Sequence, residues 1–141
     1  MGLPLKRADL QANAEAKLAD AAMLLQNQRY SNAYYLAGYA VELALKACIA
    51  LQFGAETIPD KKLVNDLYCH DLKKLVTLAG LTAELRDAQD ANEEFQARWA
   101  IVAQWEEASR YDLQDPISAQ QMLEAISNPQ TGVFQWIKQH W

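Results

Sequence analysis

Several residue types that define common classes of protein are scarce in this chain of 141 residues. It has two cysteines, Cys48 and Cys69, and they form no CxxC pair, so neither a disulfide scaffold nor a cysteine-rich zinc site is expected. Glycine and proline are also few, with 5 and 4 residues, while 51% of the chain is hydrophobic. This composition argues against a disordered chain and indicates one domain with a sizeable core.

Basic residues are in the minority, with 13 Lys and Arg against 18 Asp and Glu, a formal charge of −5. A protein that coats nucleic acid needs a dense basic surface, so non-specific binding of that kind is not expected. The positive charge that is present gathers in one section, at Lys61, Lys62, Lys73 and Lys74. This section is either an ordinary solvated face or a local docking place for a phosphate or an RNA backbone.

The N-terminal sequence MGLPLKRADL lacks the apolar run of a signal peptide, which favours a cytoplasmic protein. One later segment, residues 31–53, is long and apolar enough to cross a bilayer. Two charged residues near its centre, Glu42 and Lys46, argue against a membrane-spanning helix. We therefore expect a buried helix in a cytoplasmic protein that has no membrane partner.

What the sequence does contain is helical periodicity along most of its length. It shows no long alternation with period two and no internal repeat, so we predict an all-α fold. Short connections favour an up-and-down helical bundle of five to six helices, in a single domain of residues 1–141 with a short tail at residues 1–7. The predicted helices span residues 7–27, 31–53, 70–80, 82–110, 118–126 and 128–141, with a loop or a short helical turn at residues 55–69.

The segment 31–53 is apolar on nearly every face, which predicts a central helix whose buried residues include Leu36, Ala40, Leu43 and Ala47. One stripe along this helix is different, because it carries Tyr35, Tyr39, Glu42 and Lys46 at helical spacing. Three interpretations are open. The stripe is a wet edge, or its charges form a buried or half-buried ion pair that fixes helix packing, or it lines a cleft or a subunit interface.

Residues that begin helices are also suggested by the sequence. Ser31 or Asn32, Thr82, and the pair Asn128–Pro129 are the predicted N-terminal caps. His70 stands before Asp71 at another predicted helix start, where it either caps that helix or hydrogen-bonds to a different one.

His70 and its neighbours also raise two chemical interpretations. A catalytic role for His70 as a general base would need an Arg or Lys side chain nearby in space. Cys69 and His70 are adjacent, yet no further ligand follows at a useful spacing, so no metal site is predicted.

Three sequence strings in a fixed order resemble the HEPN domain family (higher eukaryotes and prokaryotes nucleotide-binding). They are RYSNAYYLAGYAVELALKACIA in the central helix, HDLKKL at residues 70–75, and WEEASRYD at the end of the long predicted helix. The second helix of the family carries a run that ends E-x-x-x-K-A, which here reads from Glu42 to Ala47. The resemblance covers roughly residues 8–112 of the chain.

The resemblance implies a helical bundle that commonly dimerises. Many family members act as RNases or toxins, often beside a small nucleotidyltransferase antitoxin encoded next to them. The ribonuclease members carry Arg, four to six residues and then His; the His moves the proton of an RNA 2′-hydroxyl while the Arg stabilises the phosphate, without a metal. The best counterpart of the Arg is Arg110, and the positions at which His would follow are held by Asp115, Pro116 and Ile117.

Two functions are therefore open for this sequence. The preferred one is a non-catalytic HEPN-like module that binds a nucleotide, RNA or a partner protein, in a toxin–antitoxin or defence setting with a nucleotidyltransferase. The other is a divergent metal-independent ribonuclease toxin that uses Arg110 with His70. We expect no cofactor, and we expect the binding residues to be Tyr35, Tyr39, Glu42, Lys46, Lys73, Lys74 and Arg110.

The predicted assembly is a homodimer through helix faces. The chain has four tryptophans, of which Trp99 and Trp105 are assigned to the core. The terminal pair, Trp136 and Trp141, is available to cover a partner subunit, where tryptophan is favoured.

Overall fold

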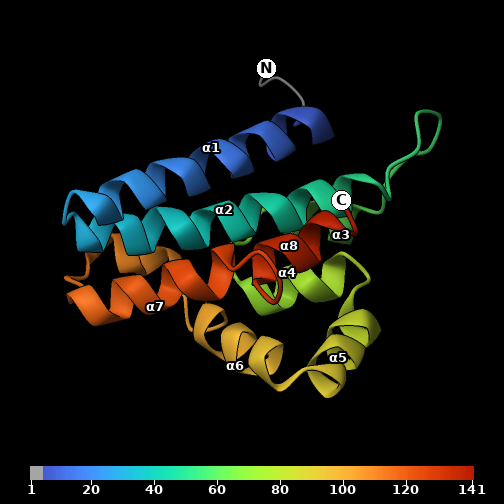
Figure 1. Cartoon of the computed structure of the whole chain (residues 1–141). Coiled ribbons are helices and arrows are strands. Elements are labelled where there is room, and N and C mark those ends of the chain that lie inside the picture. Colours follow the sequence, from blue (N-terminus) through green and yellow to red (C-terminus); the bar gives the residue numbers. More distant parts are fainter. Residues whose placement is uncertain (1–4) are drawn as a thin grey trace.

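Helices carry the architecture of the computed structural model, which describes residues 5–141 and has no strand in that range (Figure 1). The prediction of an all-α bundle is confirmed. Residues 1–4 of the predicted tail lie outside the described residues. The helices are α1 (Arg7–Gln26), α2 (Tyr30–Ala50), α3 (Lys61–Asp66), α4 (Leu72–Leu78), α5 (Thr82–Ala91), α6 (Glu93–Val102), the 3₁₀ helix η1 (Glu107–Tyr111), α7 (Pro116–Ser127) and α8 (Val133–Lys138).

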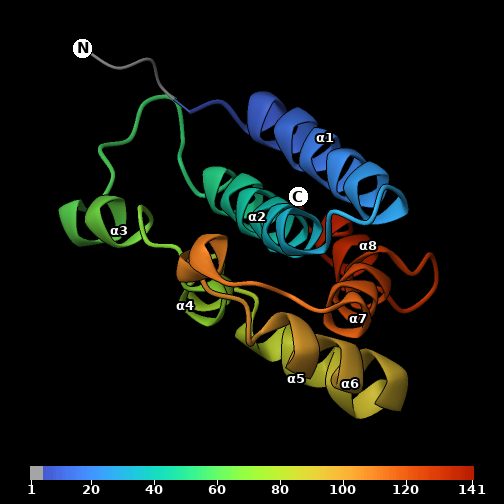
Figure 2. The same ribbon diagram turned by 90° about the vertical axis from the view of Figure 1, so that its left-hand side faces the viewer.

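The second helix is the centre of the bundle, as its all-round apolar sequence predicts. It packs along α1 and also contacts α4, α7, α8 and η1 (Figure 2). The segment Tyr30–Ala50 is long and apolar enough to cross a membrane, and most of it is buried inside the bundle, as in the core helix of a soluble protein. The apolar character of α2 therefore serves the packing of its neighbours.

The prediction of which α2 residues are buried is partly wrong. Ala40 and Ala47 are fully buried, but Leu36 and Leu43 are only half-buried. A partly exposed strip runs along α2 through Leu36, Tyr39 and Leu43, where no other helix covers it completely. The large buried side chains lie instead on the faces that meet the neighbouring helices, and they include Val41, Leu45 and Ile49.

The tryptophans lie mostly inside the molecule. Trp99, Trp105 and Trp136 are buried, and Trp136 packs against Phe95 with ring centroids 5.6 Å apart. The expectation that Trp136 covers a partner subunit is therefore wrong, because the C-terminal helix folds back onto α6. Trp141 is half-buried, and its ring packs edge-on against Phe134 at 5.6 Å.

The long helix predicted for residues 82–110 is divided into α5, α6 and η1. Asn92 interrupts it, since its backbone is extended and its side chain accepts a hydrogen bond from Phe95 N at 3.0 Å. An asparagine side chain that caps a new helix competes with continuation of the old one. This division and the additional helix α3 raise the number of α-helices in residues 5–141 to eight, above the five to six predicted.

Three helix boundaries differ from the sequence prediction. Ser31 does not cap α2, because its hydroxyl accepts a hydrogen bond from Gln114 N at 2.9 Å and ties α2 to the start of α7. Leu81, and not Thr82, is the N-cap residue of α5. At the other end, α2 ends at Ala50 and not at Phe53, because Leu51 N and Gln52 N donate to carbonyls three residues back, at 3.2 and 2.9 Å, and form an exposed turn.

The last helix begins later than predicted. Asn128 and Pro129 form a turn instead of a cap, in which Asn128 Oδ1 accepts from Gln130 N and Thr131 N at 3.0 and 2.9 Å. Helix α8 then starts at Val133 after Gly132. The proline at a helix start is Pro116 in α7, next to the capping Asp115.

Candidate functional site

The charged stripe of α2 lies inside the protein, where α2 meets α4 and η1. Glu42 is 1% exposed and Lys46 9%, and Lys46 Nζ lies 3.3 Å from Glu42 Oε2. The interpretation as a buried ion pair is therefore confirmed for these two residues, and the interpretation as a wet edge is wrong for them. A buried carboxylate requires partners of this kind because burial removes its hydration.

His70 connects α2 to the 3₁₀ helix η1. Its Nδ1 lies 2.9 Å from Glu42 Oε1, and its Nε2 lies 3.1 Å from Glu107 Oε2. The cap of α4 is Asp71, whose carboxylate accepts from Lys73 N and Lys74 N. Of the two structural roles predicted for His70, the hydrogen bond to another helix is confirmed and the capping role is wrong.

Both ring nitrogens of His70 thus face carboxylate oxygens. A neutral imidazole has one N–H, so it donates one hydrogen bond and accepts another, whereas an ionised carboxylate only accepts. Both ring nitrogens can donate to ionised carboxylates at the same time only when the ring carries two N–H groups, that is, when His70 is an imidazolium. In this arrangement the histidine holds two helices together and turns no free nitrogen toward the solvent.

Arg110 lies on η1, one turn from Glu107. Its Nη1 is 3.1 Å from Glu107 Oε1, and its guanidinium carbon is 4.8 Å from the centre of the Tyr111 ring. The hydrogen bond and charge of Tyr111, and then the charge of Glu107, raise the pKa of Arg110 above its ordinary value. Glu107 therefore joins the predicted pair, since one of its oxygens contacts His70 and the other contacts Arg110.

The position of η1 depends on a close approach between α2 and the segment before η1. Trp105 Nε1 donates to Tyr35 O at 3.2 Å, and the two aromatic rings stack with centroids 6.0 Å apart. A side chain at Gly38 would collide with the Trp105 ring, so this packing needs glycine at that position of α2. The glycine and the tryptophan together bring Glu107 within reach of His70.

The two tyrosines of the stripe lie at the edge of this network. Both are half-buried, and their rings meet edge-on at 6.0 Å. Burial raises the pKa of Tyr35 and of Tyr39; the charge of Arg110 opposes the rise at Tyr35, and that of Glu42 adds to it at Tyr39. Both phenols stay protonated at neutral pH and serve as hydrogen-bonding groups.

A surface cleft of about 380 Å³ opens beside this network, between the start of α4 and the segment that leads into η1. His70, Lys73, Asp71, Glu106 and Glu107 bring charge to its wall. Three of these five residues are acidic, so the cleft has no positive excess to attract a phosphate. Its carboxylates instead suit donors such as amino groups.

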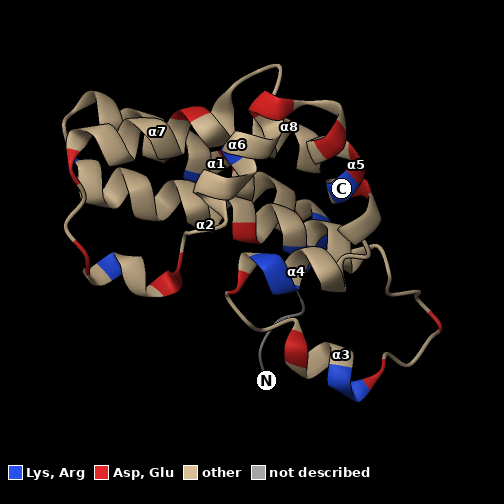
Figure 3. Ribbon diagram, turned by 90° about the horizontal axis from the view of Figure 1, so that it is seen from below, with Lys and Arg blue, Asp and Glu red and all other residues tan. Residues whose placement is uncertain are grey.

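The remaining predicted binding residues lie around this cleft or away from it. Lys73 lines the cleft, whereas Lys74 turns to Asp66 on α3, with Nζ and Oδ1 3.5 Å apart. Lys61 and Lys62 are exposed on α3, where Figure 3 shows basic and acidic residues mixed. The four lysines thus form no continuous basic surface.

Glu107 is the residue that the sequence prediction missed, although the signal was present. It stands three residues before Arg110 in the string WEEASRYD, a spacing at which opposite charges meet on a helix. Within residues 5–141, no group of three or more His, Cys, Asp or Glu side chains is placed to hold a metal ion.

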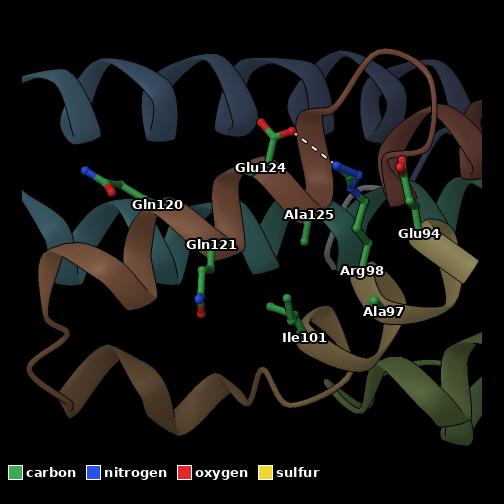
Figure 4. Close-up of a pocket in the computed structure, with 8 residues that line it drawn as sticks. All are labelled: Glu94, Ala97, Arg98, Ile101, Gln120, Gln121, Glu124 and Ala125. Carbon is green, nitrogen blue, oxygen red and sulfur yellow. Dashed lines mark hydrogen bonds and ion pairs between the residues drawn. The ribbon is translucent and has the colours of Figure 1, made fainter.

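A second cleft, of about 420 Å³, lies between α6 and α7 (Figure 4). The one basic residue among those that line it, Arg98, makes structural contacts: Nη1 donates to Thr131 Oγ1 at 2.7 Å and Nη2 lies 3.3 Å from Glu124 Oε1. Arg98 therefore fastens α6 to α7 and to the turn before α8. The network around His70 remains the better candidate site, because it joins the predicted residues.

Comparison with known proteins agrees with the sequence resemblance. No curated protein and no solved structure matches the chain. The family model for the HEPN domain matches residues 8–139, which is nearly the whole chain. Together with the all-α bundle, this match supports a module of the nucleotide-binding or ribonuclease type, and the chain belongs to the HEPN domain family.

Proposed function

We propose that this chain is a non-catalytic HEPN module that binds a nucleotide or a single-stranded RNA segment beside the His70 cleft. The observation that carries the proposal is the position of His70, whose ring nitrogens lie 2.9 Å from Glu42 and 3.1 Å from Glu107. A general base must turn a free lone pair toward its substrate. His70 turns both nitrogens to carboxylates, which supports binding without cleavage.

The surface that suits such a ligand is the exposed pair Arg110 and Tyr111, at the edge of the cleft. Tyr111 is 76% exposed, and the guanidinium lies over its ring. Single-stranded RNA is commonly bound by stacking of its bases on tyrosine rings and arginine planes. The nearby carboxylates of Glu106 and Glu107 can accept hydrogen bonds from the amino groups of a stacked base.

The binding proposal is tested by titrating the protein with mononucleotides and with short single-stranded RNA, followed by fluorescence anisotropy. Loss of one stacking partner, in Arg110→Ala or Tyr111→Ala, should weaken binding about tenfold or more. Arg86→Ala is the matched control, because Arg86 is an exposed arginine on α5. Equal affinity of all four proteins, or no binding by the wild type, would contradict the proposal.

The second candidate function is a divergent metal-independent ribonuclease that uses Arg110 with His70. One observation favours it: Glu107 contacts both residues, at 3.1 Å in each case, so the predicted pair lies at one place. In this alternative the carboxylate of Glu107 blocks Nε2 of His70 until a substrate displaces it. The base would then abstract the 2′-hydroxyl proton while Arg110 stabilises the charged phosphate.

The two functions are separated by incubating structured and single-stranded RNA with the protein in the absence of metal. The binding module leaves the RNA intact in the wild type and in Glu107→Gln. Cleavage by the wild type that is abolished by His70→Ala or Arg110→Ala supports the ribonuclease instead. Cleavage that appears only in Glu107→Gln shows a base that Glu107 holds inactive.

The proposal extends to the setting of the protein. We place it in the cytoplasm, as a homodimer that acts with a nucleotidyltransferase in a toxin–antitoxin or defence system, since the HEPN resemblance implies such partners. Tandem purification of a tagged chain, co-expressed with the product of the adjacent gene, tests the partnership. An adjacent gene that encodes no nucleotidyltransferase, or a product that does not co-purify, argues against this setting.

A further inference from the structure

A third cavity, which is largely apolar, lies beside Lys46. It has a volume of about 350 Å³ and lies between the start of α1, the last turns of α2 and α3. Its walls are mainly aliphatic and aromatic side chains, among them Leu10, Ile49, Phe53, Val64 and Leu67. Such a volume and lining are typical of pockets for small ligands.

Helix α3 forms one wall of this cavity but is not packed into the bundle. None of its residues is buried, and it makes little contact with any other helix. Figure 2 shows α3 beside the bundle and not within it. The side chain of Val64 on α3 therefore faces the cavity with apolar surface that no other helix covers, and an apolar ligand would bury that surface.

Among the described residues that line the cavity, Lys46 is the one that carries a charge. An ammonium has three N–H donors, and within residues 5–141 Glu42 Oε2 at 3.3 Å is the hydrogen-bond partner of Lys46 Nζ. Glu42 also shares its negative charge with His70, through its other oxygen. The buried ammonium thus keeps donors for an additional anionic acceptor, which is favourable where water is excluded.

We propose that this cavity binds a small amphipathic carboxylate, with its apolar chain between α2 and α3 and its carboxylate at Lys46. The apolar walls select the chain, and the ammonium selects an anionic head group over a neutral or cationic one. This ligand site is separate from the His70 cleft and goes beyond the proposed function. A medium-chain fatty acid has the required chemistry.

The test compares three probes that share one chain: decanoate and decylamine below their micellar concentrations, and decanol below its solubility limit. Displacement of a fluorescent apolar probe gives their affinities for the full chain. Decanoate should bind one per chain and about tenfold more tightly than decanol, as expected for one charge-assisted hydrogen bond, with decylamine weakest. No displacement by decanoate, or equal affinities of decanoate and decanol, would overturn the proposal.

Substitutions on α3 and at Lys46 locate the binding. Val64→Trp fills the cavity from α3 and should abolish decanoate binding, whereas Asn65→Trp adds the same bulk to an exposed position of the same helix and should not. Lys46→Met should bind decanoate and decanol equally. The single change leaves the buried charge of Glu42 with less compensation. The double variant Glu42→Gln/Lys46→Met therefore repeats the comparison of decanoate with decanol in a protein without the ion pair. A preference for decanoate that is retained in both variants would show that the head group does not bind at Lys46.

Discussion

At the scale of single residues, Glu42 is the point on which the buried charges converge. It is 1% exposed and contacts both Lys46 and His70. Removing one member of a buried pair leaves the other charge without compensation, so Lys46→Met should lower the free energy of unfolding by about 3–5 kcal/mol. The double variant Glu42→Gln/Lys46→Met should lose clearly less than the sum of the two single changes.

Denaturant unfolding of the four proteins of this cycle measures the coupling. The matched control is the exposed pair Glu15 and Lys138, whose oxygen and nitrogen lie 3.2 Å apart on the surface. The changes Glu15→Gln and Lys138→Met should be additive within about 0.5 kcal/mol, because solvent screens exposed pairs. Additive losses at Glu42 and Lys46 as well would show that the buried pair does not interact.

The two cysteines should differ in reactivity, because their surroundings differ. Burial raises the pKa of the Cys48 thiol to about 11, and its Sγ lies 3.8 Å from Ile137 O. At pH 8 only about one Cys48 in a thousand is then the reactive thiolate, while Cys69 is half-exposed. A thiol-specific chromogenic reagent should titrate one thiol per native chain rapidly and two in denaturant. Two equally rapid thiols in the native protein would show that Cys48 is not enclosed.

At the scale of the secondary-structure element, α2 supplies the clearest comparison. Leu45 is fully buried on a face that meets other helices, while Leu43 lies on the partly exposed strip. Leu45→Ala should cost about 2–5 kcal/mol of unfolding free energy through a cavity, and Leu43→Ala on the order of 1 kcal/mol. Thermal and denaturant unfolding of the two variants test this order. Equal losses would mean that the strip is covered by something other than these helices.

The same element shows how far sequence carries the fold. A segment that is apolar on nearly all faces has to be surrounded, so the central place of α2 was predictable. Which of its apolar residues are fully buried was not predictable, because Leu36 and Leu43 differ from Leu45 only in what packs against them. The interruption at Asn92 was missed for a related reason, since asparagine is compatible with a helix interior until its side chain captures Phe95 N.

At the scale of the whole molecule, the candidate site is a product of tertiary structure. Glu42 and Lys46 are four residues apart, and their pairing could be predicted from spacing alone. The contact of His70 with Glu42 joins residues 28 positions apart, and it depends on how α4 packs on α2. Periodicity contains no information on such a contact. The predicted partnership of His70 with Arg110 was a hypothesis from family resemblance, and Glu107, which mediates it, was not foreseen.

The last prediction concerns assembly. Two large apolar side chains in the segment after Arg110 are exposed: Leu113 is 95% and Ile117 66% exposed. Solvent-exposed apolar residues gathered in one segment favour a contact with another protein surface, and a second copy of this chain presents the same surface in a two-fold arrangement. We therefore expect the wild type to be a dimer by light scattering at about 20–50 μM, within the usual affinity of standard-size interfaces.

The double variant Leu113→Glu/Ile117→Glu should be a monomer with unchanged helicity, because it brings like charges together across the interface without touching the core. Ile58→Glu is the control, since Ile58 is an equally exposed apolar residue in the loop before α3. A wild type that stays monomeric over this concentration range, or a dimer that persists in the double variant, would show that this segment is not the dimer interface.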